Sequence, residues 1–182
     1  MKIVFLGLLM TGALFSCTSE KGYKIIGSVP KDMDNQMVYL EVPNESFDYN
    51  VIDSAKVVNG TFTFKGKEST PVIAAIKWGE GKRPITVVLQ DGEIKVITEP
   101  VPMVTGTSLN DSLQFISAKD IRNDPYVDTF VENNKNNIVG AYVMSYIASG
   151  YSLEEIEKYC LSHQMNLKIQ FTEKEFRNLL KV

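Results

Sequence analysis

The stretch Val51–Lys65 reads VIDSAKVVNGTFTFK, and its pattern indicates the kind of fold to expect. Two strand-like runs, Val51–Val58 and Thr61–Lys65, flank the dipeptide Asn59-Gly60. Both residues of this dipeptide tolerate the positive φ angles of a tight two-residue turn. In the second run phenylalanines alternate with polar residues, so a strand there has one apolar face and one polar face. The stretch therefore predicts a half-buried β-hairpin.

Runs of the same kind extend from Tyr23 to Thr105, and Gly, Pro, Asn and Asp residues separate them. The dipeptide Asp91-Gly92 joins two of these runs and predicts a second tight hairpin. Many short strands with turns between them indicate an antiparallel β-sandwich or a strongly curved sheet. The predicted strands are Tyr23–Val29, Met37–Val42, Val51–Val58, Thr61–Lys65, Val72–Trp78, Ile85–Leu89 and Glu93–Thr98.

The hydrophobic period becomes helical from Ser108 onward. Leu109, Leu113 and Ile116 have the i, i+4, i+7 spacing of an amphipathic helix. Two further helices are predicted, one at Tyr126–Asn134 and a buried one at Ile138–Ala148, which is apolar on nearly every side.

Two more helices are predicted from their start signals. Ser152–Glu155 and Thr172–Glu175 read as capping boxes, in which a hydroxyl and a carboxylate each satisfy a free backbone N–H group. We therefore predict an α+β fold. An antiparallel β-sandwich-like domain would cover residues 23–107, and a helical segment over residues 108–182 would pack on it or follow it.

The N-terminus has the parts of a secretory signal: a positive Lys2, an apolar run up to Phe15 and a small Ser16. The run is too short to cross a hydrocarbon core of about 30 Å as a helix. Leu14-Phe15-Ser16-Cys17 resembles the lipobox of bacterial lipoproteins, in which the signal is cut before the cysteine and fatty acids such as palmitate are attached to it. We predict a signal peptide over residues 1–16, lipidation at Cys17 and a short tether over residues 17–22. A plain secretory signal with a chance cysteine is the alternative.

Charge and cysteine content exclude some classes of function. The chain has 19 Lys and Arg residues and 22 Asp and Glu residues, and loss of Lys2 with the signal leaves 18 against 22, a balance of −4. This acidic balance argues against nucleic-acid binding. Of the two cysteines, Cys17 is assigned to the lipid, so Cys160 has no partner for an intramolecular disulfide. We expect Cys160 to be a buried residue of a helix.

The sequence contains no recognised catalytic motif, and we predict no enzyme activity. It has no Cys-x-x-Cys dithiol, no nucleophile elbow and no Walker loop. The one histidine, His163, is expected to be solvated, and no metal or cofactor site is predicted. The loop Trp78–Arg83 is rich in glycine and basic residues. A plain hairpin loop is favoured over an anion site there, because the loop lies between strands and lacks the helix N-terminus of phosphate cradles.

Several short motifs together resemble one known family: Asp53-Ser54, Val57–Phe64, Leu89–Ile94, and Val104–Thr107 with Asn110. In order and spacing they are similar to a domain of unknown function at the N-terminus of many thiol:disulfide-interchange and peroxiredoxin-like lipoproteins of Bacteroidetes. The likeness runs from about Tyr23 to Phe115. Val131–Asn134 and Gly140 resemble the helical segment that links this domain to a thioredoxin-like domain. No dithiol and no thioredoxin-like domain follow here, so the resemblance implies an envelope setting and an accessory β domain, without the redox activity of longer relatives.

Two functions follow as hypotheses. The first is a non-catalytic cell-envelope lipoprotein, held by its lipid in the outer membrane on either face, whose β domain binds an envelope protein or a small ligand. The second is an accessory subunit of an envelope thiol–disulfide or peroxide-handling system, with Cys160 as a reactive thiol. A third idea, carbohydrate binding, would require exposed aromatic side chains on a sheet face, and exposure is decided by the tertiary structure.

Overall fold

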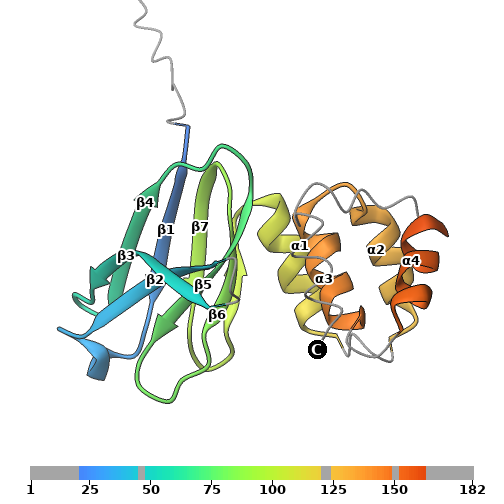
Figure 1. The fold of residues 1–182 in the computed structure, drawn as a ribbon. Coiled ribbons are helices and arrows are strands. Elements are labelled where there is room, and N and C mark those ends of the chain that lie inside the picture. The colour runs from blue at the N-terminus through green and yellow to red at the C-terminus, as the bar shows by residue number, and fades with distance from the viewer. Residues whose placement is uncertain (1–20, 45–47, 120–123, 149–151, 163–182) are drawn as a thin grey trace, which may run out of the picture.

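The protein folds into a β-sandwich with a cluster of helices beside it (Figure 1). The computed structural model describes residues 21–44, 48–119, 124–148 and 152–162. One four-stranded sheet has the order β4-β1-β7-β8 and the other the order β3-β2-β5-β6. The predicted α+β class and the sandwich are therefore confirmed. The strands are β1 (Tyr23–Ser28), β2 (Met37–Pro43), β3 (Tyr49–Lys56), β4 (Thr61–Gly66), β5 (Val72–Trp78), β6 (Ile85–Leu89), β7 (Gly92–Ile97) and β8 (Met103–Thr105).

Every predicted strand is present, and β5 and β6 have the predicted bounds. The short strand β8 was not predicted; it pairs antiparallel with the end of β7. The sheets are also not wholly antiparallel, because β1 runs parallel to β7, with Tyr23 opposite Gly92 and Ser28 opposite Ile97. A parallel pair requires a long connection between its strands. Here β2 to β6 form that connection, and β1 therefore lies between β4 and β7 in its sheet.

The two predicted tight hairpins are wrong, although the first tight turn is real. Asn59 and Gly60 have φ angles of 52° and 69°, as a two-residue turn requires. Only Val58 and Thr61 pair across the turn, because β3 belongs to one sheet and β4 to the other. Contacts with distant residues hold the turn in this corner: the Gly60 N–H donates to Asp34 Oδ1 at 2.6 Å. Asp91-Gly92 likewise joins strands of different sheets, β6 and β7.

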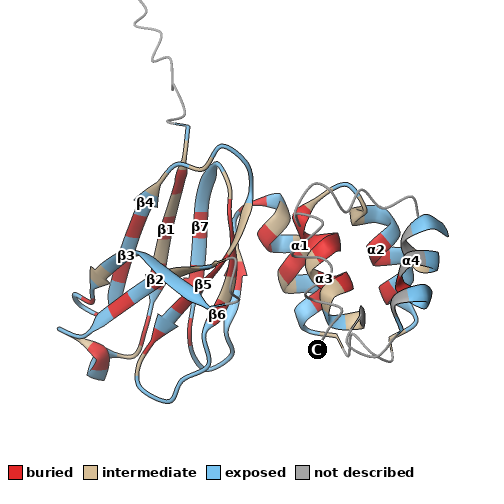
Figure 2. Cartoon of the chain, viewed as in Figure 1, coloured by how far each residue is buried: buried red, intermediate tan, exposed pale blue. Residues whose placement is uncertain are grey.

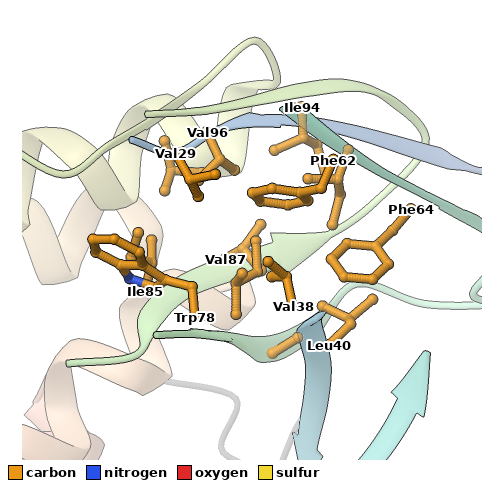
Figure 3. Close-up of a cluster of buried hydrophobic side chains, with 14 of the residues drawn as sticks. Val29, Val38, Leu40, Phe62, Phe64, Trp78, Ile85, Val87, Ile94 and Val96 are labelled. Carbon is orange, nitrogen blue, oxygen red and sulfur yellow. The ribbon is translucent and has the colours of Figure 1, made fainter. Parts of the chain in front are cut away.

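Buried residues alternate with less buried ones along the strands of the sandwich (Figure 2). The buried side chains form its hydrophobic core. Phe62 and Phe64 are 2% and 1% exposed while Thr63 between them is exposed, as the alternation predicts. Figure 3 shows both rings among aliphatic side chains, with Trp78 beside Ile85 at the other end of the same cluster. Each large apolar side chain buried in this way stabilises the fold by about 1.5–3 kcal/mol.

Helices α1 (Ser108–Ser117), α2 (Tyr126–Asn134), α3 (Ile138–Ala148) and α4 (Leu153–Ser162) follow the sandwich. Helices α2 and α3 have the predicted bounds. Figure 1 shows α1 and α3 nearest the sandwich and α2 and α4 farther from it. The helices form a second hydrophobic core that includes Val88 of β6 and has Ile73 of β5 packed against it. Leu113 and Ile116 are buried in this core, and Leu109 packs at its edge, as their spacing predicts.

The asparagine-rich turn between α2 and α3 is held by side-chain hydrogen bonds. Asn134 Nδ2 donates to the carbonyl oxygen of Phe130 at 2.9 Å and so caps the end of α2. Asn137 Nδ2 donates to Asn134 Oδ1 at 2.9 Å. The Oδ1 atom of Asn137 accepts from the N–H groups of Val139 and Gly140 at 2.9 and 3.3 Å, which caps the start of α3.

The capping box at Ser152 is confirmed. The Ser152 N–H donates to Glu155 Oε2 at 2.8 Å, and the Glu155 N–H donates to Ser152 Oγ at 3.4 Å. The hydrogen bonds from Ser152, its hydroxyl first, hold the pKa of the Glu155 carboxyl below its usual value. The signal peptide, Cys17, His163 and the second capping box at Thr172 lie outside the described residues.

Candidate functional site: the groove between sandwich and helices

Asn110 fastens α1 to the sandwich. Its Oδ1 atom accepts from the Val88 N–H and its Nδ2 atom donates to the Val88 carbonyl oxygen, both at 2.8 Å. The second Nδ2 hydrogen goes to Thr107 Oγ1, also at 2.8 Å. Both Asn110 and Val88 are 0% exposed. The oxygen and both N–H groups of this buried carboxamide therefore have a partner, and these bonds hold the start of α1 against β6.

Three further hydrogen bonds hold the helices against the strands. Gln114 Oε1 accepts from the Val104 N–H of β8 at 2.7 Å. Gln90 Oε1 accepts from the Leu109 N–H at 3.1 Å. The hydroxyls of Thr86 on β6 and Tyr142 on α3 lie 3.3 Å apart. Burial raises the pKa of the Tyr142 hydroxyl well above its ordinary value, so it stays protonated and available as a donor.

A groove of about 480 Å³ lies where these elements meet. The start of β6, the loop before β8 and the C-terminal half of α1 each form one side. Its volume lies within the range of about 300–1,000 Å³ for small-molecule sites, which often occur at junctions between structural units. The lining residues are Arg83, Pro84, Ile85, Thr86, Val101, Pro102, Val104, Leu113, Gln114, Ser117 and Ala118.

A smaller cavity of about 250 Å³ lies between α3 and α4. It is lined mainly by apolar atoms of Met144, Ile147, Ile156 and Tyr159. It adjoins Ser162, the last described residue of the chain. Of these two cavities, the groove at the junction is the larger, and it lies between the sandwich and the helices.

The outer face of β2 and β3 carries exposed apolar and aromatic side chains. Tyr39 on β2 is 39% exposed, and Tyr49 and Val51 on β3 are 57% and 55% exposed. Tyr146 of α3, 50% exposed, stacks edge-on against Tyr142 with ring centroids 5.0 Å apart. The exposed aromatics that carbohydrate binding would require are thus present on this sheet face.

The loop Trp78–Arg83 joins β5 and β6 as an antiparallel hairpin, as favoured from the sequence. Lys82 Nζ lies 2.7 Å from Glu99 Oε1 and 5.2 Å from the centroid of the Trp78 ring. The Trp78 Nε1 atom is buried and has no acceptor among the described residues. Arg83, at the end of the loop, reaches the groove.

Cys160 lies in the last turn of α4, as the helical pattern predicted, but its side chain is outside the described part of the structure. Its burial therefore stays a prediction. Within the described ranges, no three His, Cys, Asp or Glu side chains come together as metal ligands. None of the helices there is long and apolar enough to cross a membrane.

Sequence reasoning missed the groove, because its lining comes from three separate segments of the chain. One feature of the sequence did indicate a buried hydrogen bond next to the groove. Asn110 stands three residues before Leu113, on the buried face of α1, and a polar residue on such a face needs a buried partner. The partner, Val88, could not be identified from the sequence, since it is a backbone group 22 residues away.

Comparison with known proteins identifies one family. The sequence model of the family described as Domain of unknown function (DUF4369) matches residues 23–113, which cover the sandwich and most of α1. No curated protein and no solved structure matches the chain.

Proposed function

This chain belongs to the DUF4369 family of unknown function, and we propose that it is a non-catalytic binding lipoprotein of the cell envelope. In this proposal Cys17 carries the lipid anchor, residues 17–22 are the tether, and the groove between sandwich and helices takes a small ligand. The proposed location is the outer membrane.

The observation that carries the proposal is a preformed groove with a rigid frame. The junction is fixed by the buried pair of Asn110 and Val88 and by the bond from Val104 to Gln114. Binding to a site that is already formed avoids the entropy cost of ordering loops and side chains. A groove held by hydrogen bonds on both of its sides is therefore suited to binding.

The envelope setting rests on the signal and lipobox motifs at residues 1–17. Several acyl chains on one cysteine would hold the protein firmly, since each buried CH₂ group adds about 0.8 kcal/mol of membrane affinity. We also propose that the protein works beside thiol:disulfide-interchange lipoproteins, which its motifs resemble. Its own part would be binding, because after lipidation Cys160 is the one remaining cysteine of this sequence, and disulfide exchange needs a second thiol to resolve the mixed disulfide.

Recovery of bound metabolites tests the proposal. The chain from residue 18 onward would be incubated with an envelope metabolite extract, repurified and analysed by mass spectrometry. Ala118→Trp places a large ring at the groove from an exposed position directly after α1, so it should fill the site without disturbing either core. Thr63→Trp is the matched control, since Thr63 is exposed on β4, outside the groove lining.

The expected result is at least one small molecule that copurifies with the unchanged protein and with Thr63→Trp. Its recovery should fall at least tenfold with Ala118→Trp. Equal recovery from all three proteins, or enrichment of nothing, would contradict the assignment of this groove as the binding site.

A further inference from the structure

The groove is lined by one charged residue, and that residue is a cation. Arg83 is the charged residue of the lining, which contains no Asp or Glu. Among the described residues, Arg83 takes part in no ion pair or hydrogen bond. Its neighbour Lys82 differs, because Glu99 neutralises it at 2.7 Å. Glu80, an acid in the same loop, does not line the groove. The lining therefore carries one positive charge, and no described acidic side chain forms an ion pair with it.

The neutral polar side chains of the groove can also donate hydrogen bonds. Gln114 uses its Oε1 atom to accept from the Val104 N–H, which leaves its amide N–H groups without an acceptor among the described residues. The hydroxyl of Ser117 is another potential donor. A planar arginine fork matches the two oxygens of a carboxylate better than any neutral group does. These donors favour a ligand whose head carries acceptor oxygens and a negative charge.

The position of the negative head follows from Arg83 and from the C-terminal end of α1. Ser117 and Ala118 lie at the C-terminal end of this helix, where unpaired carbonyl groups carry a partial negative charge of about half an elementary charge. That end repels an anion, whereas Arg83 carries a full positive charge at the start of β6. An anionic head is therefore placed at Arg83, away from the end of α1.

The remainder of the groove is apolar. Ile85, Val104 and Leu113 line it and are 6%, 4% and 3% exposed. Val101 lines it from the loop before β8 and is 65% exposed, so a ligand would cover an apolar side chain that water now contacts. Burial of this apolar surface would favour a hydrocarbon body over a second polar group.

Building on the proposed function, we propose that the groove binds a small amphipathic monocarboxylate, such as a medium-chain fatty acid. Arg83 binds the carboxylate. The hydrocarbon chain lies over Ile85, Val104 and Leu113 under Val101. Charge complementarity favours a negatively charged head, and the apolar lining favours a hydrocarbon chain.

Two probes of equal chain length test this assignment. Octanoate and octanamide differ in the charge of the head, and binding of each to the chain from residue 18 onward can be measured by titration calorimetry and amide NMR shifts. Arg83→Gln removes the charge and keeps a polar donor. Lys77→Gln removes the same charge from an exposed position on β5, outside the groove lining, and serves as the control.

Octanoate should bind at least tenfold more tightly than octanamide, and it should shift the amide signals of Thr86, Gln114 and Ala118. Arg83→Gln should weaken octanoate binding at least tenfold and leave octanamide unchanged, while Lys77→Gln should have no effect.

Equal affinities for the two probes, both lost in Ala118→Trp, would overturn the assignment of an anionic ligand and leave the proposed function standing. Tighter binding of N-acetyl-leucyl-valine than of octanoate would reassign the groove to peptide C-termini and so contradict a fatty-acid ligand. Failure of the proposed function itself has a separate readout, which is metabolite recovery that Ala118→Trp does not change.

Discussion

Asn110 of α1 makes with Val88 of β6 the two hydrogen bonds that a neighbouring β-strand would make. Its carboxamide accepts from the Val88 N–H and donates to the Val88 carbonyl oxygen, each at 2.8 Å. Strand β6 is the edge of its sheet. One side chain therefore satisfies the peptide groups of Val88 on the open edge and joins the helices to the sandwich. This relationship links the two hydrophobic cores.

Replacement of Asn110 should destabilise the whole protein. In Asn110→Ala the N–H and carbonyl groups of the buried Val88 lose their partners, which should lower the free energy of unfolding by about 2–6 kcal/mol, at about 1–3 kcal/mol for each unsatisfied group. Urea unfolding measures this loss. Asn133→Ala is the control, because Asn133 is exposed on α2. Equal stability of the two variants would show that the Asn110 bonds contribute little.

Asn110→Asp tests the same hydrogen bonds to Val88 through the pH dependence of stability. In this variant a protonated carboxyl group could still donate to the Val88 carbonyl oxygen, whereas a carboxylate could not. Burial should raise the folded pKa of the introduced carboxyl above the unfolded value of about 3.9. The variant should therefore approach wild-type stability below about pH 4 and lose stability as pH rises from there through the folded pKa. A stability difference from wild type that does not change with pH would contradict this account.

Removal of the helices should leave an unstable sandwich. A chain ending at residue 107 would expose Ile73 and Val88, which pack in the helical core. It would also leave the Val88 peptide groups open on an edge strand, and such edges favour aggregation. We expect aggregation or a lower melting temperature by calorimetry, and a partial recovery in a chain ending at residue 119, which keeps α1. A monomeric truncated sandwich as stable as the longer chain would mean that the sandwich is independent of the helices.

Gly140→Ala tests the close approach of α2 and α3. A Cβ atom at Gly140 would lie 2.2 Å from the backbone oxygen of Asn134, so the turn between the helices would have to move. Alanine normally stabilises a helix interior by about 1 kcal/mol relative to glycine. Here we expect a loss of about 1–3 kcal/mol, typical of an overpacked site. Unfolding in urea shows whether the substitution lowers or raises the free energy of unfolding. A more stable Gly140→Ala variant would show that the turn can move at little cost.

We predict that Cys17 carries a lipid anchor. Metabolic labelling with a fatty acid should label the protein in its native envelope, and the membrane fraction should retain it. Cys17→Ala should abolish both the label and the retention, while Cys160→Ala should change neither. Label on Cys17→Ala would refute the proposed anchor.

Cys160 should have no catalytic activity. It stands in the last turn of α4, where the negative end of the helix dipole disfavours a thiolate, the reactive form of cysteine. The chain from residue 18 onward should therefore neither reduce insulin disulfides nor turn over peroxide. Cys160→Ala should lower stability by at most about 1 kcal/mol. Turnover that disappears in Cys160→Ala would support the alternative, a redox-accessory subunit.

The positions of most strands and helices could be predicted because they depend on neighbouring residues. The alternation of Phe62 and Phe64 with polar residues marks a half-buried strand, and the apolar run Ile138–Ala148 marks a helix with the correct bounds. The dipeptide Asn59-Gly60 likewise specified its own backbone angles. These features are local, so a short run of consecutive residues contains the information.

Pairing between strands was less predictable. The turn at Asn59-Gly60 has hairpin angles, yet β3 and β4 enter different sheets. The tertiary structure decides this, because Asp34 and other residues far along the chain bind the turn in the corner of the sandwich. The parallel pairing of β1 with β7 also depends on distant residues, since the strands between them along the chain include all four strands of the other sheet.

The class of the fold and the extent of most of its elements could be predicted from the sequence, because each depends on a short run of residues. The motifs that resemble those of exported lipoproteins are local in the same way. The tertiary structure was needed to establish which strands are neighbours, that Asn110 completes the edge of β6, and that Arg83, Val101 and Gln114 line one groove. The physical reason is distance along the chain. The hydrophobic period of a strand or helix, like a tight turn, depends on adjacent residues. The shape and charge of a groove depend instead on which distant apolar faces are buried against each other.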